Sequence, residues 1–98
     1  MKALLDNLTA AGVHTLLVHF TDIHGVAKGK LVPLAHLDDV LTVGAGFSGP
    51  SIAGTGLPRM GARSEFYGRG DIATARALPW MPGYARLACD GFVAGQAF

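Results

Sequence analysis

The sequence predicts a single α+β domain with a mixed sheet, containing a hairpin, a packing helix and a long glycine-rich loop. Its 98 residues fit the usual size of one domain, so residues 1–98 are taken as a single unit. Half of the residues are hydrophobic and only 15% are charged, which excludes an intrinsically disordered chain. Apolar residues recur at helical spacing in two segments and alternate in several others, which indicates mixed helices and strands.

The first third is expected to form a helix followed by a β-hairpin. Lys2–Ala11 carries leucines at helical spacing, and Gly12 can end the helix. Val13–Thr21 is rich in alternating β-branched and aromatic residues, which is typical of a strand. The turn Asp22–Gly25 has Asp first and Gly fourth, and Val26–Val32 then returns as the second strand, with its two lysines on one face.

A second helix and a long loop are expected next. Pro33 suits a first helical turn, an apolar stripe follows it, and Gly44 can end the helix. Ala45–Arg63 has five glycines and two prolines with little periodicity, so we predict an ordered loop. In this loop Gly46 and Gly49 are expected to adopt positive φ angles.

Gly44–Gly49 matches the pattern G-x-G-x-x-G, which in dinucleotide-binding folds joins a strand to a helix. Pro50 and the glycines that follow it oppose a helix at this place. The motif therefore favours loop geometry, with a nucleotide-binding fragment as a minor alternative.

The C-terminal third is expected to consist of short strands and turns. Asp90-Gly91 is a frequent dipeptide in tight hairpin turns. The expected elements are a strand at Ser64–Tyr67, a turn or capped helical turn at Asp71–Thr74, a strand at Arg76–Leu78, a turn at Pro79–Gly83, a strand at Tyr84–Asp90 and an edge strand at Phe92–Phe98.

Charge and cysteine content exclude several function classes. The net charge is +1 and the basic residues are scattered, so neither nucleic acid nor an anionic membrane is an expected partner. The chain has no signal-like segment and no apolar run near the ~20 residues of a membrane span. Cys89 is the only cysteine, so no internal disulfide can form, and we expect a cytoplasmic protein.

The residue types give no catalytic residue with certainty. Glu65 is the only glutamate, and the aspartates are dispersed, whereas a metal–nucleotide site needs several converging carboxylates. His14 and His19 have opposite parity on one strand, so they do not form a metal pair. Cys89 is expected to pack in the core, where a thiol is inert. No metal or cofactor is therefore expected to bind to this chain alone.

The order of several motifs resembles the N-terminal β-grasp domain of the glutamine synthetase family. The hairpin has the family's Asp-x-x-Gly turn, a basic strand and a proline, and Phe47–Ile52 resembles its Phe-Asp-Gly-Ser-Ser-Ile loop. Tyr67–Asp71 is similar to the type III branch found in some bacteria. Further similar positions are Ser64-Glu65, Asp71 with Thr74, Leu78-Pro79-Trp80 and Tyr84–Asp90.

The resemblance implies a domain of a glutamate–ammonia or glutamate–amine ligase in glutamine biosynthesis and nitrogen metabolism. In that family a second domain binds ATP, Mg²⁺ or Mn²⁺ and glutamate, and a γ-glutamyl phosphate reacts with the amine. The N-terminal domain closes the active site of a neighbouring subunit in a homo-oligomer. The resemblance therefore places Ser48, Gly49, Ser51 and Glu65 in a substrate-side loop. It also implies that the catalytic domain is missing from this chain, which alone would be inactive.

One departure from the family pattern bears on the substrate. Ser48 stands where the family has an ammonium-binding aspartate, and Pro50 stands at the next serine position. A hydroxyl cannot supply negative charge for a cation, so a larger amine than ammonia is an open alternative. A stand-alone β-grasp module that binds a partner protein without catalysis is the second hypothesis.

Overall fold

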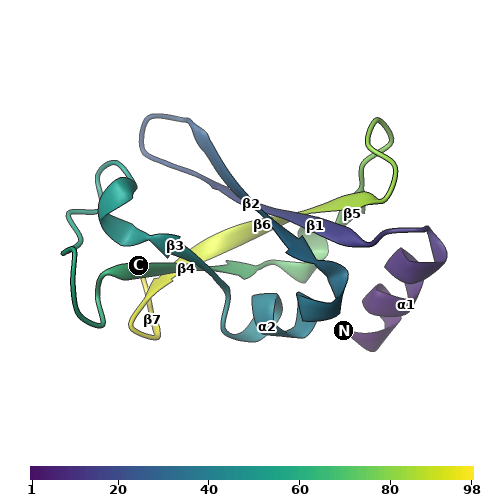
Figure 1. The fold of residues 1–98 in the computed structure, drawn as a ribbon, viewed down its shortest axis with the longest axis horizontal. Coiled ribbons are helices and arrows are strands. Elements are labelled where there is room, and N and C mark those ends of the chain that lie inside the picture. The colour runs from purple at the N-terminus through teal and green to yellow at the C-terminus, as the bar shows by residue number, and fades with distance from the viewer.

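The computed structural model describes all 98 residues, and Figure 1 shows its elements in order. The helices are α1 (Lys2–Ala10) and α2 (Leu37–Thr42), with 3₁₀ turns η1 (Leu34–His36), η2 (Gly49–Ser51) and η3 (Ile72–Thr74). The strands are β1 (Thr15–Thr21), β2 (Ala27–Pro33), β3 (Ala45–Ser48), β4 (Glu65–Gly70), β5 (Arg76–Ala77), β6 (Tyr84–Val93) and β7 (Gln96–Ala97). Neither helix has the length and apolar character needed to cross a bilayer.

The strands form one mixed sheet in the order β2-β1-β6-β4-β3. β1 is antiparallel to β2 and parallel to β6, and β4 is antiparallel to both β6 and β3. The short strands β5 and β7 pair with β6 as well. The hairpin, the intervening helix and the parallel central pair confirm the predicted α+β class with a β-grasp-like sheet.

The main core lies between the sheet and the two helices, which occupy the same side of it in Figure 1. Alternation along β1 points Leu16 and Val18 to this side, where they are fully buried. Leu8 of α1 and Leu37 and Val40 of α2 pack against them, as the predicted apolar stripes require. The sequence therefore predicts which faces of these elements are buried.

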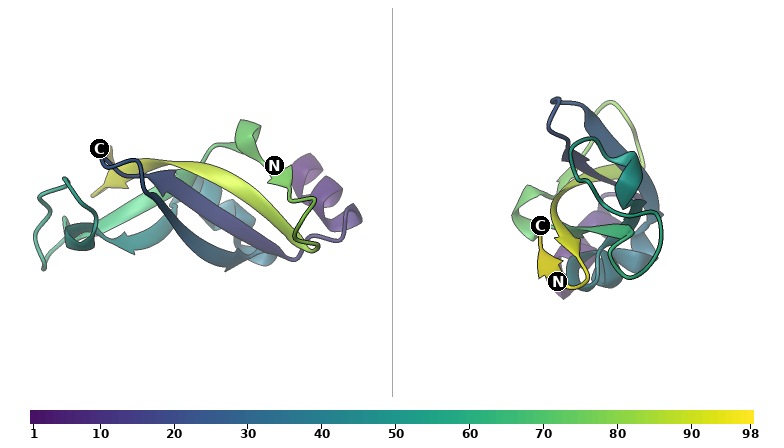
Figure 2. Two further views of the ribbon diagram at one scale, coloured as in Figure 1. Left: turned by 90° about the horizontal axis from the view of Figure 1, so that it is seen from above. Right: turned by 90° about the vertical axis from the view of Figure 1, so that its left-hand side faces the viewer.

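The sheet is strongly curled, and this brings together strands that do not pair. The Phe20 ring on β1 lies 5.0 Å from the Phe47 ring on β3 and 4.8 Å from the Phe66 ring on β4. Since β6 and β4 separate β1 from β3 in the sheet, a flat sheet could not make the first contact. The end view in Figure 2 shows the curvature. Phe66 belongs to a second, smaller core with Ile52, Leu57 and Val93.

The prediction of a loop over Ala45–Arg63 is wrong at its start. Ala45–Ser48 forms the edge strand β3, and η2 follows directly. Glycine and alanine have low strand propensity, so pattern alone does not detect this strand. Pairing of each of its residues with β4 stabilises it instead, with Phe47 opposite Phe66.

The hairpin turn predicted at Asp90-Gly91 is also wrong. β6 continues to Val93, and the turn comes at Ala94 (φ 50°) and Gly95 (φ 79°), both with the positive φ of a type I′ turn. Gly91 is needed for packing, because a Cβ atom there would overlap the Phe66 ring. The C-terminal edge strand is accordingly short, and the strand predicted at Arg76–Leu78 spans two residues.

Candidate functional site

The four residues predicted in a substrate-side loop lie together at the end of β3. Ser48 is the last residue of β3, and it pairs with Glu65, the first residue of β4. Gly49 and Ser51 form η2 directly after it. The Ser51 hydroxyl donates a hydrogen bond to Ser48 Oγ at 3.3 Å. Two separate segments of the chain therefore contribute to one exposed edge.

Strand alternation decides which way these side chains point. Phe47 and Phe66 face the core, so Ser48 and Glu65 lie on the opposite, exposed side. The Glu65 carboxylate lies over Gly46, since a Cβ atom at Gly46 would be 3.1 Å from Oε2. Ser48 is hydrogen-bonded to a hydroxyl and not to a base. The edge can therefore hydrogen-bond a polar group, but it is not arranged for nucleophilic catalysis.

Gly49 is buried, and hydrogen bonds of its backbone hold it in place. Its N–H donates to Ser64 O at 2.8 Å, and its carbonyl accepts from Thr55 Oγ1 at 2.7 Å. The predicted positive φ is wrong for both Gly46 and Gly49, and Gly44 has it instead, at 105°. A Cβ atom at Gly49 would lie only 2.8 Å from Ser64 O. Close backbone approach, and not turn conformation, requires glycine here.

The glycine pattern of Gly44–Gly49 does not form a dinucleotide-binding turn. It follows α2, runs along β3 and ends in the 3₁₀ turn η2. A dinucleotide motif needs the reverse order, with a strand before the glycines and a helix N-terminus after them. The structure thus contradicts the minor alternative.

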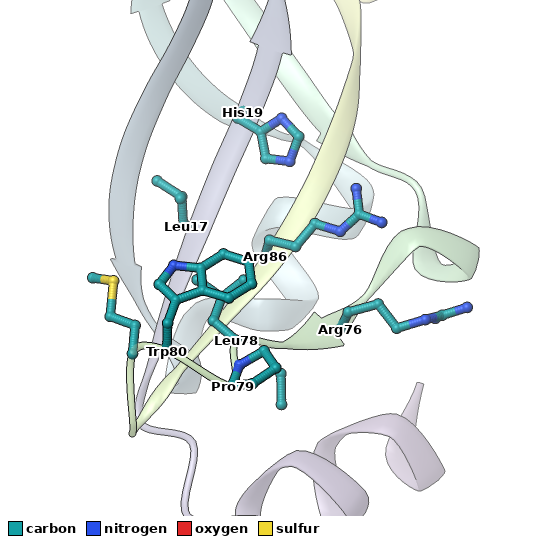
Figure 3. A pocket seen from close by; sticks show the side chains of 9 residues that line it. Leu17, His19, Arg76, Leu78, Pro79, Trp80 and Arg86 are labelled. Carbon is teal, nitrogen blue, oxygen red and sulfur yellow. The ribbon is translucent and has the colours of Figure 1, made fainter.

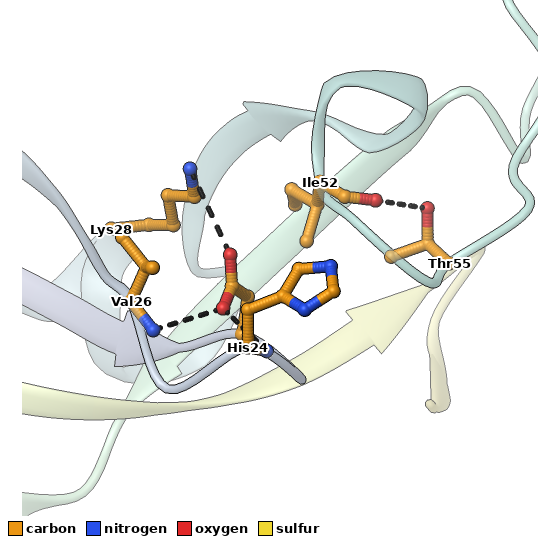
Figure 4. A network of polar contacts seen from close by, with 6 residues as sticks. His24, Val26, Lys28, Ile52 and Thr55 are labelled. Atoms are coloured by element: carbon orange, nitrogen blue, oxygen red, sulfur yellow. Dashed lines mark hydrogen bonds and ion pairs between the residues drawn. The ribbon is translucent and has the colours of Figure 1, made fainter.

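The turn between β1 and β2 is built around the carboxylate of Asp22 (Figure 4). It accepts hydrogen bonds from the N–H groups of His24 at 2.9 Å and Val26 at 3.0 Å, with Lys28 Nζ at 3.8 Å. These bonds, chiefly that from Val26, hold the pKa of the Asp22 carboxyl below its usual value. Asp22 therefore fixes the hairpin turn and is not free to bind a ligand.

This turn also contacts the loop that follows η2. Ile23 packs against Gly54, where a Cβ atom would overlap its side chain. Next to it Thr55 Oγ1 donates to Ile52 O at 3.0 Å, as Figure 4 shows. The 52–55 segment is thus held from both sides, and with it the position of η2.

The acidic side chains of this chain do not fit a metal ion. No three His, Cys, Asp or Glu side chains gather closely enough to hold one. Asp71 caps η3 by accepting from the Ala73 N–H at 3.0 Å, and Asp22 is occupied by its turn. Glu65 lies beside Gly46 and Ser48, neither of which has a carboxylate. This donor set does not match metal-bound phosphates, which need several carboxylates.

Lys30 links the two outer strands of the sheet. It pairs with Val18, so its side chain extends on the inner face of β2. Its Nζ donates a hydrogen bond to Gly46 O of β3 at 3.1 Å. Because Gly49 N–H bonds to β4, alternation turns the Gly46 carbonyl to the free edge, where Lys30 is its donor. The sequence predicts the direction of this lysine but not its partner, which depends on the curl.

Replacing Lys30 with methionine is expected to loosen β3 while keeping the apolar stem of the side chain. Loss of one partly exposed, charge-assisted hydrogen bond of about 1 kcal/mol raises local opening about fivefold. Amide hydrogen exchange at Phe47 and Gly49 measures this. Lys28→Met is the control, because Lys28 lies two residues away on the same face and contacts Asp22 instead. Equal exchange in both variants would show that Lys30 does not hold β3.

Comparison with known proteins places the chain in a family. It is 47% identical over 85 residues to a glutamate–methylamine ligase of Methyloversatilis universalis, covering 86% of this chain and 19% of the relative. It is 36% identical over 93 residues to a glutamine synthetase of Halobacterium salinarum, covering 91% and 20%. The chain belongs to the glutamine synthetase family. No protein-family model matches it.

Two solved structures share the fold of this chain. A GmaS–ADP complex matches over 100% of this chain and 22% of the GmaS chain, with a TM-score of 0.84 and 32% identity. GmaS without ligand matches with the same TM-score. The chain spans about a fifth of the length of these two relatives, 19% of the glutamate–methylamine ligase and 20% of the glutamine synthetase. These matches confirm the prediction that the chain belongs to this family and corresponds to its N-terminal domain. The assignment to the type III branch stays a prediction.

Proposed function

We propose that this chain is the N-terminal domain of an ATP-dependent ligase that joins glutamate to an amine. In this proposal the edge formed by Ser48, Gly49, Ser51 and Glu65 completes the active site of a neighbouring catalytic domain. The 47% identity to a protein named glutamate–methylamine ligase is the observation that carries the proposal. The fold shared with a GmaS–ADP complex supports it.

ATP and Mg²⁺ or Mn²⁺ would be held by the catalytic domain and not by this chain. The carboxylates described above are dispersed or already hydrogen-bonded, which supports this division of roles. The role of the present residues is to cover the amine side of the pocket and to exclude water. A cytoplasmic homo-oligomer, in which one subunit covers the site of the next, is part of the same proposal.

The chemistry of Ser48 favours an alkylamine over ammonium. Ammonium and methylammonium are both cations at neutral pH, and they differ in the N–H donor that the methyl group replaces. A carboxylate offers more acceptor sites than a hydroxyl, so an aspartate would suit the additional donor of ammonium better than Ser48 does. Pro50 is exposed beside it and adds apolar surface suited to an alkyl group. Hydroxyl and proline together fit methylamine, which carries one methyl group and fewer N–H donors than ammonium.

A full-length ligase that carries this chain as its N-terminal domain tests the function. Phosphate release should require ATP, glutamate and methylamine together, and the 98-residue chain alone should release none. A full-length protein that assembles but hydrolyses no ATP with any amine would contradict the proposal and favour a non-catalytic interaction module.

Replacing Ser48 with aspartate in that ligase is expected to move its preference toward ammonium. A charge-assisted hydrogen bond that ammonium makes in the direction of the methyl group of methylammonium, worth about 1.5–3 kcal/mol, corresponds to a change of about 10- to 100-fold in relative kcat/KM. The ratio of kcat/KM for methylamine and ammonium measures this. Thr42→Asp adds the same charge at the exposed end of α2, outside the edge formed by Ser48, Gly49, Ser51 and Glu65, and should leave the ratio unchanged. An unaltered ratio in Ser48→Asp would show that Ser48 does not line the amine site.

A further inference from the structure

A hollow of about 520 Å³ lies on the face of the sheet opposite the helices. It contains none of the residues of the candidate site. Leu17, on the side of β1 opposite the buried Leu16 and Val18, contributes to its floor. The Trp80 indole stands beside it with 77% of its surface exposed (Figure 3). The remaining apolar wall is formed by Ala77, Leu78, Pro79 and Met81.

Two arginines contribute to the lining of this hollow, and no carboxylate forms an ion pair with either of them. Arg76 on β5 is directly opposite Arg86 on β6, which in turn lies beside Leu17. Like charges placed opposite each other in a sheet are destabilising. Neither arginine forms an ion pair, although Arg76 donates to Ala75 O at 2.7 Å. Burial, and then the charge of Arg86, lowers the pKa of the nearby His19.

An exposed indole over an apolar hollow has the composition of an interface core, in which tryptophan and arginine are enriched. The two uncompensated arginines specify the charge of the partner surface, which must carry carboxylates. A small anion would neutralise the arginines but would leave the indole in water. A second copy of this chain would bring identical arginines together in a two-fold interface.

We propose that this Trp80 hollow docks onto the catalytic domain of the ligase, with apolar side chains against Trp80 and carboxylates against Arg76 and Arg86. The proposal rests on the proposed function, because it names the partner of this domain. The relatives are about five times as long as this chain, which covers 19% and 20% of them, so most of such a protein lies outside it. Contact at the hollow would hold this domain on the catalytic domain, while the edge that contains Ser48 faces the substrate.

Thiol labelling of an introduced cysteine tests the docking surface. Ala77→Cys places an exposed thiol in the hollow, in a Cys89→Ala background. We expect labelling to be at least tenfold slower in the full-length ligase than in the 98-residue chain. Asn7→Cys, exposed on α1 on the other side of the sheet, is the control and should be labelled at similar rates in both. The double variant Arg76→Glu/Arg86→Glu should restore fast labelling of Ala77→Cys in the full-length protein.

Three results would overturn the proposal. Equal labelling of Ala77→Cys in the chain and in the full-length ligase would show that the hollow stays open. Protection of the isolated chain by inorganic phosphate or benzoate would identify a small-anion site. Protection that grows with the concentration of the isolated chain would identify a second copy as the occupant. Labelling reports on docking whether or not the ligase is active, so its failure is distinct from failure of the proposed function.

Discussion

Replacing Gly49 with alanine is expected to lower the free energy of unfolding by about 1–3 kcal/mol, the usual penalty for overpacking. The added Cβ would lie 2.8 Å from Ser64 O and 2.5 Å from Leu57 Cδ1. Leu57 can adjust its side chain, but the Ser64 carbonyl belongs to the backbone and accepts the Gly49 N–H. Relief therefore requires β3 and the start of β4 to separate, which also displaces Ser48. Urea unfolding followed by circular dichroism measures the change.

Gly46→Ala is the matched control for this prediction. It lies three residues earlier, on β3, and the nearest atom to its Cβ would be Oε2 at the flexible end of Glu65, at 3.1 Å, with Tyr67 at an ordinary contact distance of 3.6 Å. Because its φ is not positive, alanine also restricts the unfolded chain, which stabilises by about 0.4–1 kcal/mol. We expect a change within about 1 kcal/mol for Gly46→Ala. Equal losses in both variants would show that the contact with Ser64 does not decide the requirement for glycine.

Elements with a local signal could be predicted from the sequence. The leucines of α1, the alternation of β1 and the Asp22 turn each lie within a few residues, and the structure places all three as expected. The capped turn at Asp71 was identified in the same way. In each case the residues that specify the element are also those that stabilise it.

Elements specified by distant contacts could not be predicted. β3 depends on β4 for its pairing. Gly91 has the sequence context of a turn residue, but it lies within β6, where the ring of Phe66 leaves no room for a Cβ atom. The bond from Lys30 to Gly46 depends on the curl of the whole sheet. The residues of the candidate site came from family resemblance, and the structure brings them together. Their part in catalysis stays a prediction.

The Trp80 hollow shows the same limit. Arg76 and Arg86 are ten positions apart in a chain whose basic residues are scattered, and only strand pairing makes them neighbours. The sequence identified Leu78-Pro79-Trp80 as part of a family pattern but gave no reason for an exposed indole. A net charge of only +1 therefore does not exclude a local cationic surface.

Alkylation of Cys89 is expected to be about 100-fold slower in the folded chain than in urea at pH 8. Burial on the core side of β6 raises the pKa of this thiol from 9.0 to about 11. Two pKa units reduce the reactive thiolate about 100-fold, and packing against the core slows access further. Rates with iodoacetamide at several pH values measure this, and Ala77→Cys in a Cys89→Ala background gives the rate of an exposed thiol.

The pH dependence of this thiol follows from the direction of the shift. Since the folded state holds the proton more tightly than the unfolded state, folding favours the protonated thiol. Its contribution to stability is complete below about pH 9 and is lost as the pH rises toward 11, the range between the two pKa values. Alkylation of the folded chain should therefore increase about tenfold per pH unit from pH 8 to 10. Alkylation at pH 8 as fast as that of Ala77→Cys would mean that Cys89 is exposed and does not pack against the main core.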